Sequence, residues 1–155
     1  MTNGHGTKVR KRDGSLTPLN LEKVHMIVEE ACEGLGGGVS ASQIEMSSGL
    51  QFFDGIETKD IQEILIRSAS DLISLETPNY QYAAARLLLY AVRKQVFGSG
   101  WTSGYPSVYD HVVKCADHDV YDKDILDKYT EEEWNQIESW IDHERNSVHV
   151  KATRN

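Results

Sequence analysis

Two cations beside a tight turn near the N-terminus have the types and the spacing of a phosphate-binding pair. Lys11 and Arg12 lie directly before Asp13-Gly14, a dipeptide typical of a β-hairpin turn. The residues on either side alternate as short antiparallel strands do, so the hairpin would bring both cations to one place. The sequence therefore favours an anion site here, and the alternative is a solvated basic hairpin.

Two predicted helix starts would complete such a site. Asn20 is a good N-cap for the helix after the hairpin, and Lys23 lies in its first turn. Thr58 is the predicted N-cap of a third helix, where its hydroxyl and the free N–H groups would face an anion. Lys94, late in a fourth helix, would add another positive charge if the helices are antiparallel.

Apolar side chains near these helix starts offer a surface for a nucleobase. Val24 lies one turn after Asn20, and Phe52 lies near the end of the second predicted helix. Taken singly, each of these residues has an ordinary role in capping, ion pairing or the core. Their combination favours a ligand that carries both phosphates and a base.

Apolar stripes of helical period position these residues on four helices. Ser40 to Gln43 is typical of a capping box, and Thr77 is the predicted N-cap before Pro78 at a first helical position. Glycines and short polar turns separate the stripes. The four predicted helices cover residues 21–35, 40–53, 58–73 and 78–97.

Two shorter apolar stripes follow a glycine-rich stretch, and the second begins at a capping box, Thr130 to Glu133. The sequence thus predicts a mainly α, α+β fold: a four-helix bundle capped by the N-terminal β-hairpin and followed by a short helical extension. The predicted segments are a flexible N-terminus over residues 1–7, the bundle domain over 8–98, a linker over 99–104, a helical segment over 105–145 and a tail over 146–155.

Composition limits the functional classes. A chain of 155 residues with 39% hydrophobic and 26% charged residues is typical of a soluble globular protein. Its net charge of −8 argues against general nucleic-acid binding. The absence of a long apolar run predicts no membrane span. Two cysteines, Cys32 and Cys115, form no disulfide framework and predict a cytoplasmic location.

One histidine–cysteine series has the spacing of metal ligands. His111, Cys115 and His118 would share one side of a helix, as three zinc ligands can. No fourth ligand follows at a convincing spacing, and Cys115 also fits an apolar stripe, so we expect no metal site. No serine, cysteine or histidine lies in a recognisable nucleophile motif, so we expect no catalytic residue.

Motifs along nearly the whole chain resemble one protein family. In the bundle they are Val9-x-Lys11-Arg12-Asp13-Gly14, Asn20-Leu21-x-Lys23-Val24, Gln51-Phe52-Phe53-Asp54-Gly55-Ile56-x-Thr58-x-Asp60-Ile61 and Pro78-x-Tyr80-Gln81-Tyr82-x-Ala84-Ala85-Arg86-Leu87. In the extension they are Tyr109-Asp110-His111-Val112-Val113-Lys114, Tyr129-Thr130-Glu131-Glu132-Glu133 and Ile141-Asp142-His143-x-Arg145. The bundle resembles an ATP-cone domain, and the whole resembles the N-terminal region of the large (alpha) subunit of bacterial or phage class Ia ribonucleoside-diphosphate reductase.

This resemblance implies an allosteric site that controls overall activity. In the family, ATP bound in the cone keeps the reductase active, and dATP drives it into inhibited oligomers with the small, radical-bearing subunit. Magnesium would accompany the triphosphate. By matching positions, the phosphates would be held by Lys11, Arg12, Thr58 and Lys94. The base and sugar would be surrounded by Thr17, Asn20, Lys23, Val24 and Phe52, with Asp60 near the ribose and Gln62 near the nucleotide.

Two positions depart from the family pattern. Thr17 replaces a glutamate near the base, and Gln62 replaces a histidine near the nucleotide. From these changes we expect adenine nucleotides to bind but dATP inhibition to be weak or lost. The chain ends without a catalytic barrel, which indicates a truncated subunit or half of a split gene. We therefore expect it to be inactive alone. The implied partners are the small subunit and, if the gene is split, a separate catalytic fragment of the large subunit.

Two alternatives have the same cone motifs. A transcriptional repressor of reductase genes also carries an ATP cone, but that family begins with a four-cysteine zinc ribbon. No cysteine precedes Cys32, which argues against the repressor. The other alternative is a degenerate cone that is kept only as an assembly surface.

Overall fold

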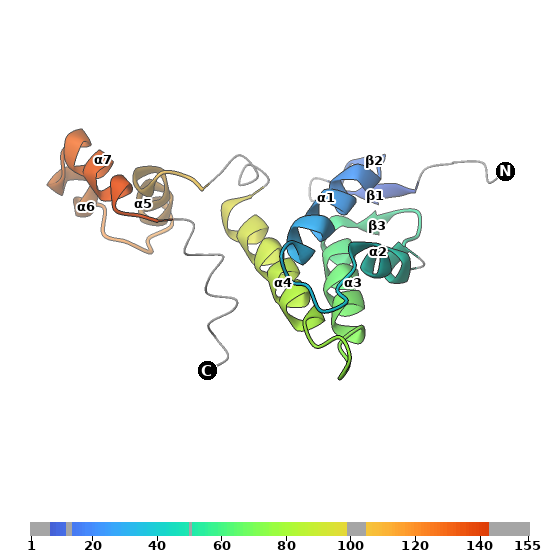
Figure 1. The fold of residues 1–155 in the computed structure, drawn as a ribbon. Coiled ribbons are helices and arrows are strands. Elements are labelled where there is room, and N and C mark those ends of the chain that lie inside the picture. The colour runs from blue at the N-terminus through green and yellow to red at the C-terminus, as the bar shows by residue number, and fades with distance from the viewer. Residues whose placement is uncertain (1–6, 12–13, 50, 99–104, 143–155) are drawn as a thin grey trace. The chain divides into compact units, whose positions relative to one another are not determined.

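The chain divides into two compact units in the computed structural model. One is formed by Met1–Val92 and the other by Arg93–Asn155. The structure describes residues 7–11, 14–49, 51–98 and 105–142 (Figure 1). The predicted linker, the predicted tail and most of the predicted flexible N-terminus lie outside these residues. No helix of the described ranges is long and apolar enough to cross a membrane.

A small sheet opens the first unit. Its strands are β1 (Lys8–Arg10), β2 (Leu16–Pro18) and β3 (Ile56–Glu57), in the order β2-β1-β3. The antiparallel β1–β2 pair confirms the predicted hairpin, with Val9 opposite Thr17. Strand β3 was not predicted; it runs parallel to β1 and pairs Val9 with Ile56. Both apolar residues are buried, which turns one face of the sheet toward the helices.

Four helices share one core with this sheet, and four helices were predicted: α1 (Leu21–Cys32), α2 (Ala41–Gly49), α3 (Thr58–Asp71) and α4 (Tyr80–Phe97) (Figure 1). Their apolar stripes form one core, because the buried positions recur at helical spacing. Its helical members include Val24, Val28, Ile44, Leu65, Ala69, Ala83 and Leu87. The α+β class with a β cap is therefore confirmed.

Two predicted helix starts are displaced. Glu57, not Thr58, is the N-cap of α3, since β3 holds its backbone extended at φ −80° and ψ 148°. Helix α4 begins at Tyr80 instead of Pro78, because residues 78 and 79 form a turn. The side chain of Asn79 leaves this turn and donates from Nδ2 to the Leu35 carbonyl at 2.9 Å.

The Tyr80 hydroxyl bonds to both residues of the capping box that was predicted at the start of α2, Ser40 and Gln43. The Ser40 N–H donates to the Tyr80 hydroxyl oxygen at 3.0 Å, and that hydroxyl donates to Gln43 Oε1 at 2.8 Å. The tyrosine is only 1% exposed, so its polar atom requires these partners. A side chain from α4 thereby ties that helix to the start of α2.

Gly37 provides a stability test of the loop between α1 and α2. Its φ is +62°, and a Cβ would lie 2.7 Å from Asn79 Nδ2. We expect Gly37→Ala to lower the free energy of unfolding by about 2 kcal/mol, through left-handed strain and displacement of the Asn79 amide. Gly36 has φ +57°, and a Cβ there would meet no atom within 4 Å, so Gly36→Ala is the matched control. Urea titrations should show that Gly37→Ala is about 1 kcal/mol less stable than Gly36→Ala. Equal losses of stability would show that the contact with the Asn79 amide has no effect.

The second unit contains α5 (Val108–Asp117), α6 (Asp124–Lys128) and α7 (Glu131–Ser139). The predicted helices α5 and α7 are confirmed, as is the reciprocal capping box of Thr130 and Glu133. Helix α6 was not predicted. Trp134 packs edge-on against the rings of Tyr109 and Tyr129 at centroid distances of 5.7 and 5.4 Å. These contacts give the second unit a small core of its own.

Candidate functional site

The sheet brings the end of β1 to the start of α3. Arg10 and Glu57 are paired in register, and the Thr58 hydroxyl donates to the Arg10 carbonyl at 3.4 Å. Lys11 follows directly, exposed at the turn, where its N–H donates to the Ser15 carbonyl at 2.9 Å. Lys11 and Thr58, 47 positions apart in the sequence, therefore lie in one neighbourhood. Arg12 lies outside the described residues.

The start of α3 combines a helix N-terminus with charges of both signs. The Glu57 side chain makes no cap hydrogen bond among the described residues, although Glu57 is the N-cap. Its carboxylate instead lies 3.1 Å from Lys59 Nζ, and this contact raises the pKa of Lys59 above its ordinary value. The helix dipole and the first-turn N–H groups favour an anion at this end, and β1 brings the Lys11 backbone close to it. Asp60 lies half-buried in the same turn.

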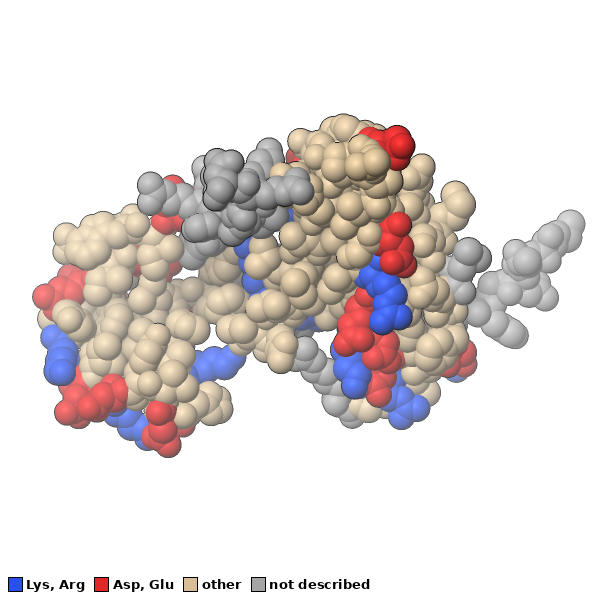
Figure 2. Space-filling view, turned by 90° about the horizontal axis from the view of Figure 1, so that it is seen from below, with Lys and Arg blue, Asp and Glu red and all other residues tan. Residues whose placement is uncertain are grey.

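Charges of both signs occur on one face of the first unit. Figure 2 shows Lys and Arg side chains next to Asp and Glu on the face of the first unit that it presents. That face is therefore not one continuous basic surface.

The corner between β2 and α1 carries the predicted base-side residues. Asn20 is the N-cap of α1, as predicted, and its Oδ1 accepts from the Lys23 N–H at 2.8 Å. Thr17 is half-buried opposite Val9, Lys23 is exposed, and Val24 is 9% exposed. Since β2 pairs with β1, this corner belongs to the same sheet as the hairpin cations.

Gln62 presents a buried donor that has no partner within the described part of the chain. It lies one turn after Thr58 on α3, and among the described residues its Nε2 atom is buried and has no hydrogen-bond partner. A buried unpaired amide costs about 1–3 kcal/mol, so an acceptor on a ligand would remove this cost. Phe52 is half-buried against the core of the same unit. The donor set and this orphaned amide fit a phosphate-bearing ligand with further polar acceptors.

Lys94 belongs to the second unit, whereas the residues above belong to the first. It lies in the last turn of α4, two residues into the second unit. Its role as a phosphate ligand therefore stays a prediction. The same holds for the individual ligand contacts of the other site residues.

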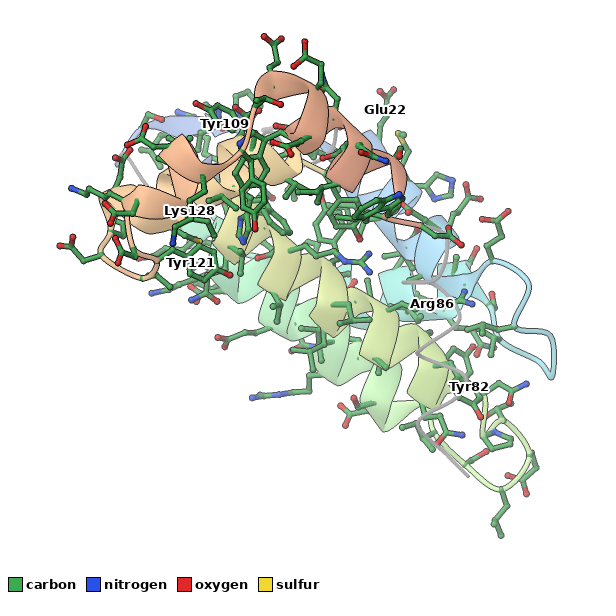
Figure 3. All side chains as sticks on the ribbon, turned by 90° about the vertical axis from the view of Figure 1, so that its left-hand side faces the viewer. Glu22, Tyr82, Arg86, Tyr109, Tyr121 and Lys128 are labelled. Carbon is green, nitrogen blue, oxygen red and sulfur yellow. The ribbon has the colours of Figure 1, made fainter. Side chains whose placement is uncertain are left out.

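Two anchors of the site were missed in the sequence. The Lys8 N–H donates to Asp54 Oδ1 at 2.7 Å, and the Gly55 N–H donates to the Lys8 carbonyl at 2.8 Å, which fixes the approach to α3. At the other end of α1, Arg86 Nη1 on α4 donates to the carbonyls of Ala31 at 3.2 Å and Glu33 at 2.7 Å (Figure 3). Their partners are mostly backbone atoms, which leave no side-chain pattern in the sequence.

In the histidine–cysteine series of α5, His111 Nε2 lies 3.7 Å from Cys115 Sγ. His118 is the exposed C-cap residue of that helix. Within the described ranges, no three His, Cys, Asp or Glu side chains are placed to hold a metal ion.

Comparison with known proteins gives one consistent result. The family model described as the ATP cone domain matches residues 7–95. The chain is 48% identical over 137 residues to the ribonucleoside-diphosphate reductase 1 subunit alpha of Escherichia coli (strain K12), covering 88% of this chain and 18% of that protein. It is 47% identical over the same shares to the Salmonella typhimurium protein of that name. It is 36% identical over 139 residues to the subunit alpha of Enterobacteria phage T4, again 88% and 18%. The chain thus spans about a fifth of the length of these relatives.

Proposed function

The chain belongs to the ATP-cone family, and from this premise we propose that its first unit binds ATP or dATP as an allosteric effector of a ribonucleoside-diphosphate reductase. The reductase activity belongs to proteins about five times as long, so this chain would contribute regulation of that activity. The effector would control deoxyribonucleotide synthesis by favouring one state of the assembly over another.

The observation that carries this proposal is the meeting of β1 with α3. It sets the Lys11 backbone next to a helix start at Thr58, whose N-cap side chain makes no capping bond to the residues that the structure describes. We assign the phosphates to Lys11, Arg12, Thr58 and Lys94. We assign the base and sugar to the corner of β2 and α1, with these residues: Thr17, Asn20, Lys23, Val24, Phe52, Asp60 and Gln62.

Each part of the nucleotide would meet a matching group. Ammonium and helix N–H donors would neutralise the triphosphate, and Val24 and Phe52 would exclude water from one side of the base. The buried Gln62 amide would donate to an acceptor of the nucleotide. Magnesium would accompany the phosphates and leave several of its sites to water. The partners we propose are the small radical-bearing subunit and the catalytic part of the large subunit, in an oligomer.

Isothermal titration of the 155-residue chain with ATP, dATP and GTP, with and without magnesium, tests the proposal. We expect ATP and dATP to bind and GTP to bind at least several-fold more weakly. No measurable heat with either adenine nucleotide would overturn the proposed function. Equal affinity for GTP would overturn its adenine specificity.

The departures at Thr17 and Gln62 give a prediction for the complete reductase assembly. A carboxylate is a stronger acceptor for the base amino group than a hydroxyl, and a histidine adds a ring that can titrate. We expect dATP to inhibit the native assembly weakly and the Thr17→Glu, Gln62→His assembly at several-fold lower concentration. Product formation against dATP concentration measures this difference. Identical inhibition curves would show that the two departures have no effect.

A further inference from the structure

The ring of His25 lies between two carboxylates that come from two helices. His25 Nδ1 is 2.7 Å from Glu45 Oε1 on α2, and His25 Nε2 is 3.2 Å from Glu29 Oε1, one turn further along α1. A neutral imidazole carries one N–H, and ionised carboxylates only accept hydrogen bonds. The contact with Glu45 is a hydrogen bond and the contact with Glu29 is an ion-pair contact. Two carboxylates at these distances favour the protonated ring, and we call this arrangement an imidazolium clasp.

The position of the clasp relates it to the candidate site. His25 directly follows Val24, in the part of α1 that Asn20 caps. Arg86 holds the opposite end of α1 to α4. The contact with Glu45 therefore fixes the end of α1 that faces the proposed nucleotide.

We propose that His25 is a proton-dependent clasp between α1 and α2 that makes nucleotide affinity depend on pH. The link to affinity rests on the proposed function, whereas the clasp itself does not. With the ring protonated, α1 is fixed against α2 and the corner that Asn20 caps is held in place, so the nucleotide binds more tightly. By linkage, the bound nucleotide favours protonation of His25.

The charges around the ring give the direction of the pH effect. The hydrogen bond to Glu45, followed by the charges of Glu29 and Glu45, raises the pKa of His25 above its ordinary value of 6.5. Within the described ranges these are the charged groups that act on the ring, one from α1 and one from α2. The contribution of the clasp to stability is thus complete below pH 6.5 and is lost as the pH rises through the raised pKa.

Thermal unfolding without nucleotide tests the clasp alone. Between pH 5.5 and 8.5 we compare the native chain with His25→Gln, with Glu45→Gln and with His118→Gln as the matched control from the second unit. We expect the native chain to unfold about 1–3 °C above His25→Gln at pH 5.5 and to lose this difference by pH 8.5. In Glu45→Gln, the stabilisation by His25 should disappear at a lower pH than in the native chain. The unfolding temperature of His118→Gln should depend on pH as that of the native chain does. A difference that does not change with pH would overturn the clasp.

Titration with ATP at pH 6.0 and 8.0 tests the link to the nucleotide. ATP itself takes up a proton in this range, but equally with the native chain and with His25→Gln. We expect the affinity of the native chain to fall about two- to threefold more than that of His25→Gln between the two pH values. If both proteins bind ATP and the ratio of their affinities at the two pH values is the same, the link between the clasp and the nucleotide is wrong. The proposed function would not be affected by that result. No binding at either pH would overturn the proposed function, and the unfolding experiment would still decide the clasp.

Discussion

Lys11→Ala is expected to weaken ATP binding by about 1.5–3 kcal/mol, the range for hydrogen bonds to charged groups, which is about 10- to 150-fold in Kd. The Lys11 side chain is exposed at the hairpin turn, next to Arg10, whose carbonyl accepts from the Thr58 hydroxyl. Its ammonium would meet the phosphates where the dipole of α3 also attracts them. We expect the same loss for Lys94→Ala, on the basis of its matching position in the ATP-cone family.

The fold should survive both changes. The hydrogen bonds that close the hairpin at Lys11 use its backbone atoms, which alanine keeps. Lys128→Ala is the control, since it removes the same charge from an exposed position of the second unit. Isothermal titration measures the affinity, and urea unfolding checks the stability of each variant. Unchanged affinity in both lysine variants would place the phosphate site elsewhere, and an equal loss in Lys128→Ala would indicate a general effect of net charge.

The helices were predictable because their signals are local. Period-3.6 stripes and cap residues such as Asn20 and Thr130 are contained in single short windows, and the structure has both caps in place. The hairpin was predictable for the same reason, since Asp13-Gly14 marks its turn. Strand β3 was not predictable, because two residues show no alternation and their pairing with β1 spans more than forty positions. That pairing also extends Glu57 and so moves the helix cap away from Thr58.

The candidate site was predictable where residue types carry the chemistry. Cations, a capping asparagine and a helix-start threonine can be recognised in the sequence. The anchors at Lys8 and Arg86 could not be recognised, because Lys8 bonds through its backbone atoms and Arg86 bonds to backbone carbonyls. The burial of the Gln62 amide was also hidden, since a lone glutamine on a helix is typical of the surface. A position that breaks the local pattern in this way is often functional.

Gln62→Met is expected to act in opposite directions on stability and on binding. The buried Nε2 atom has no hydrogen-bond partner among the described residues, so an unbranched apolar side chain of similar length removes an unpaired donor. The free energy of unfolding without nucleotide should therefore rise by about 1–3 kcal/mol. If the same amide donates to the bound nucleotide, ATP affinity should fall by about tenfold or more.

Gln51→Met is the matched control for this pair of effects. The Gln51 Nε2 atom already donates to the Ser47 carbonyl at 3.2 Å and to Ser68 Oγ at 3.4 Å. Removing it should lower the free energy of unfolding by about 0.5–1.5 kcal/mol and leave ATP affinity unchanged. Urea unfolding without nucleotide and isothermal titration with ATP measure the two quantities for both variants. If Gln62→Met is less stable than the native chain, the Gln62 amide has a hydrogen-bond partner in the folded protein. If Gln62→Met binds ATP as tightly as the native chain does, the amide does not donate to the nucleotide.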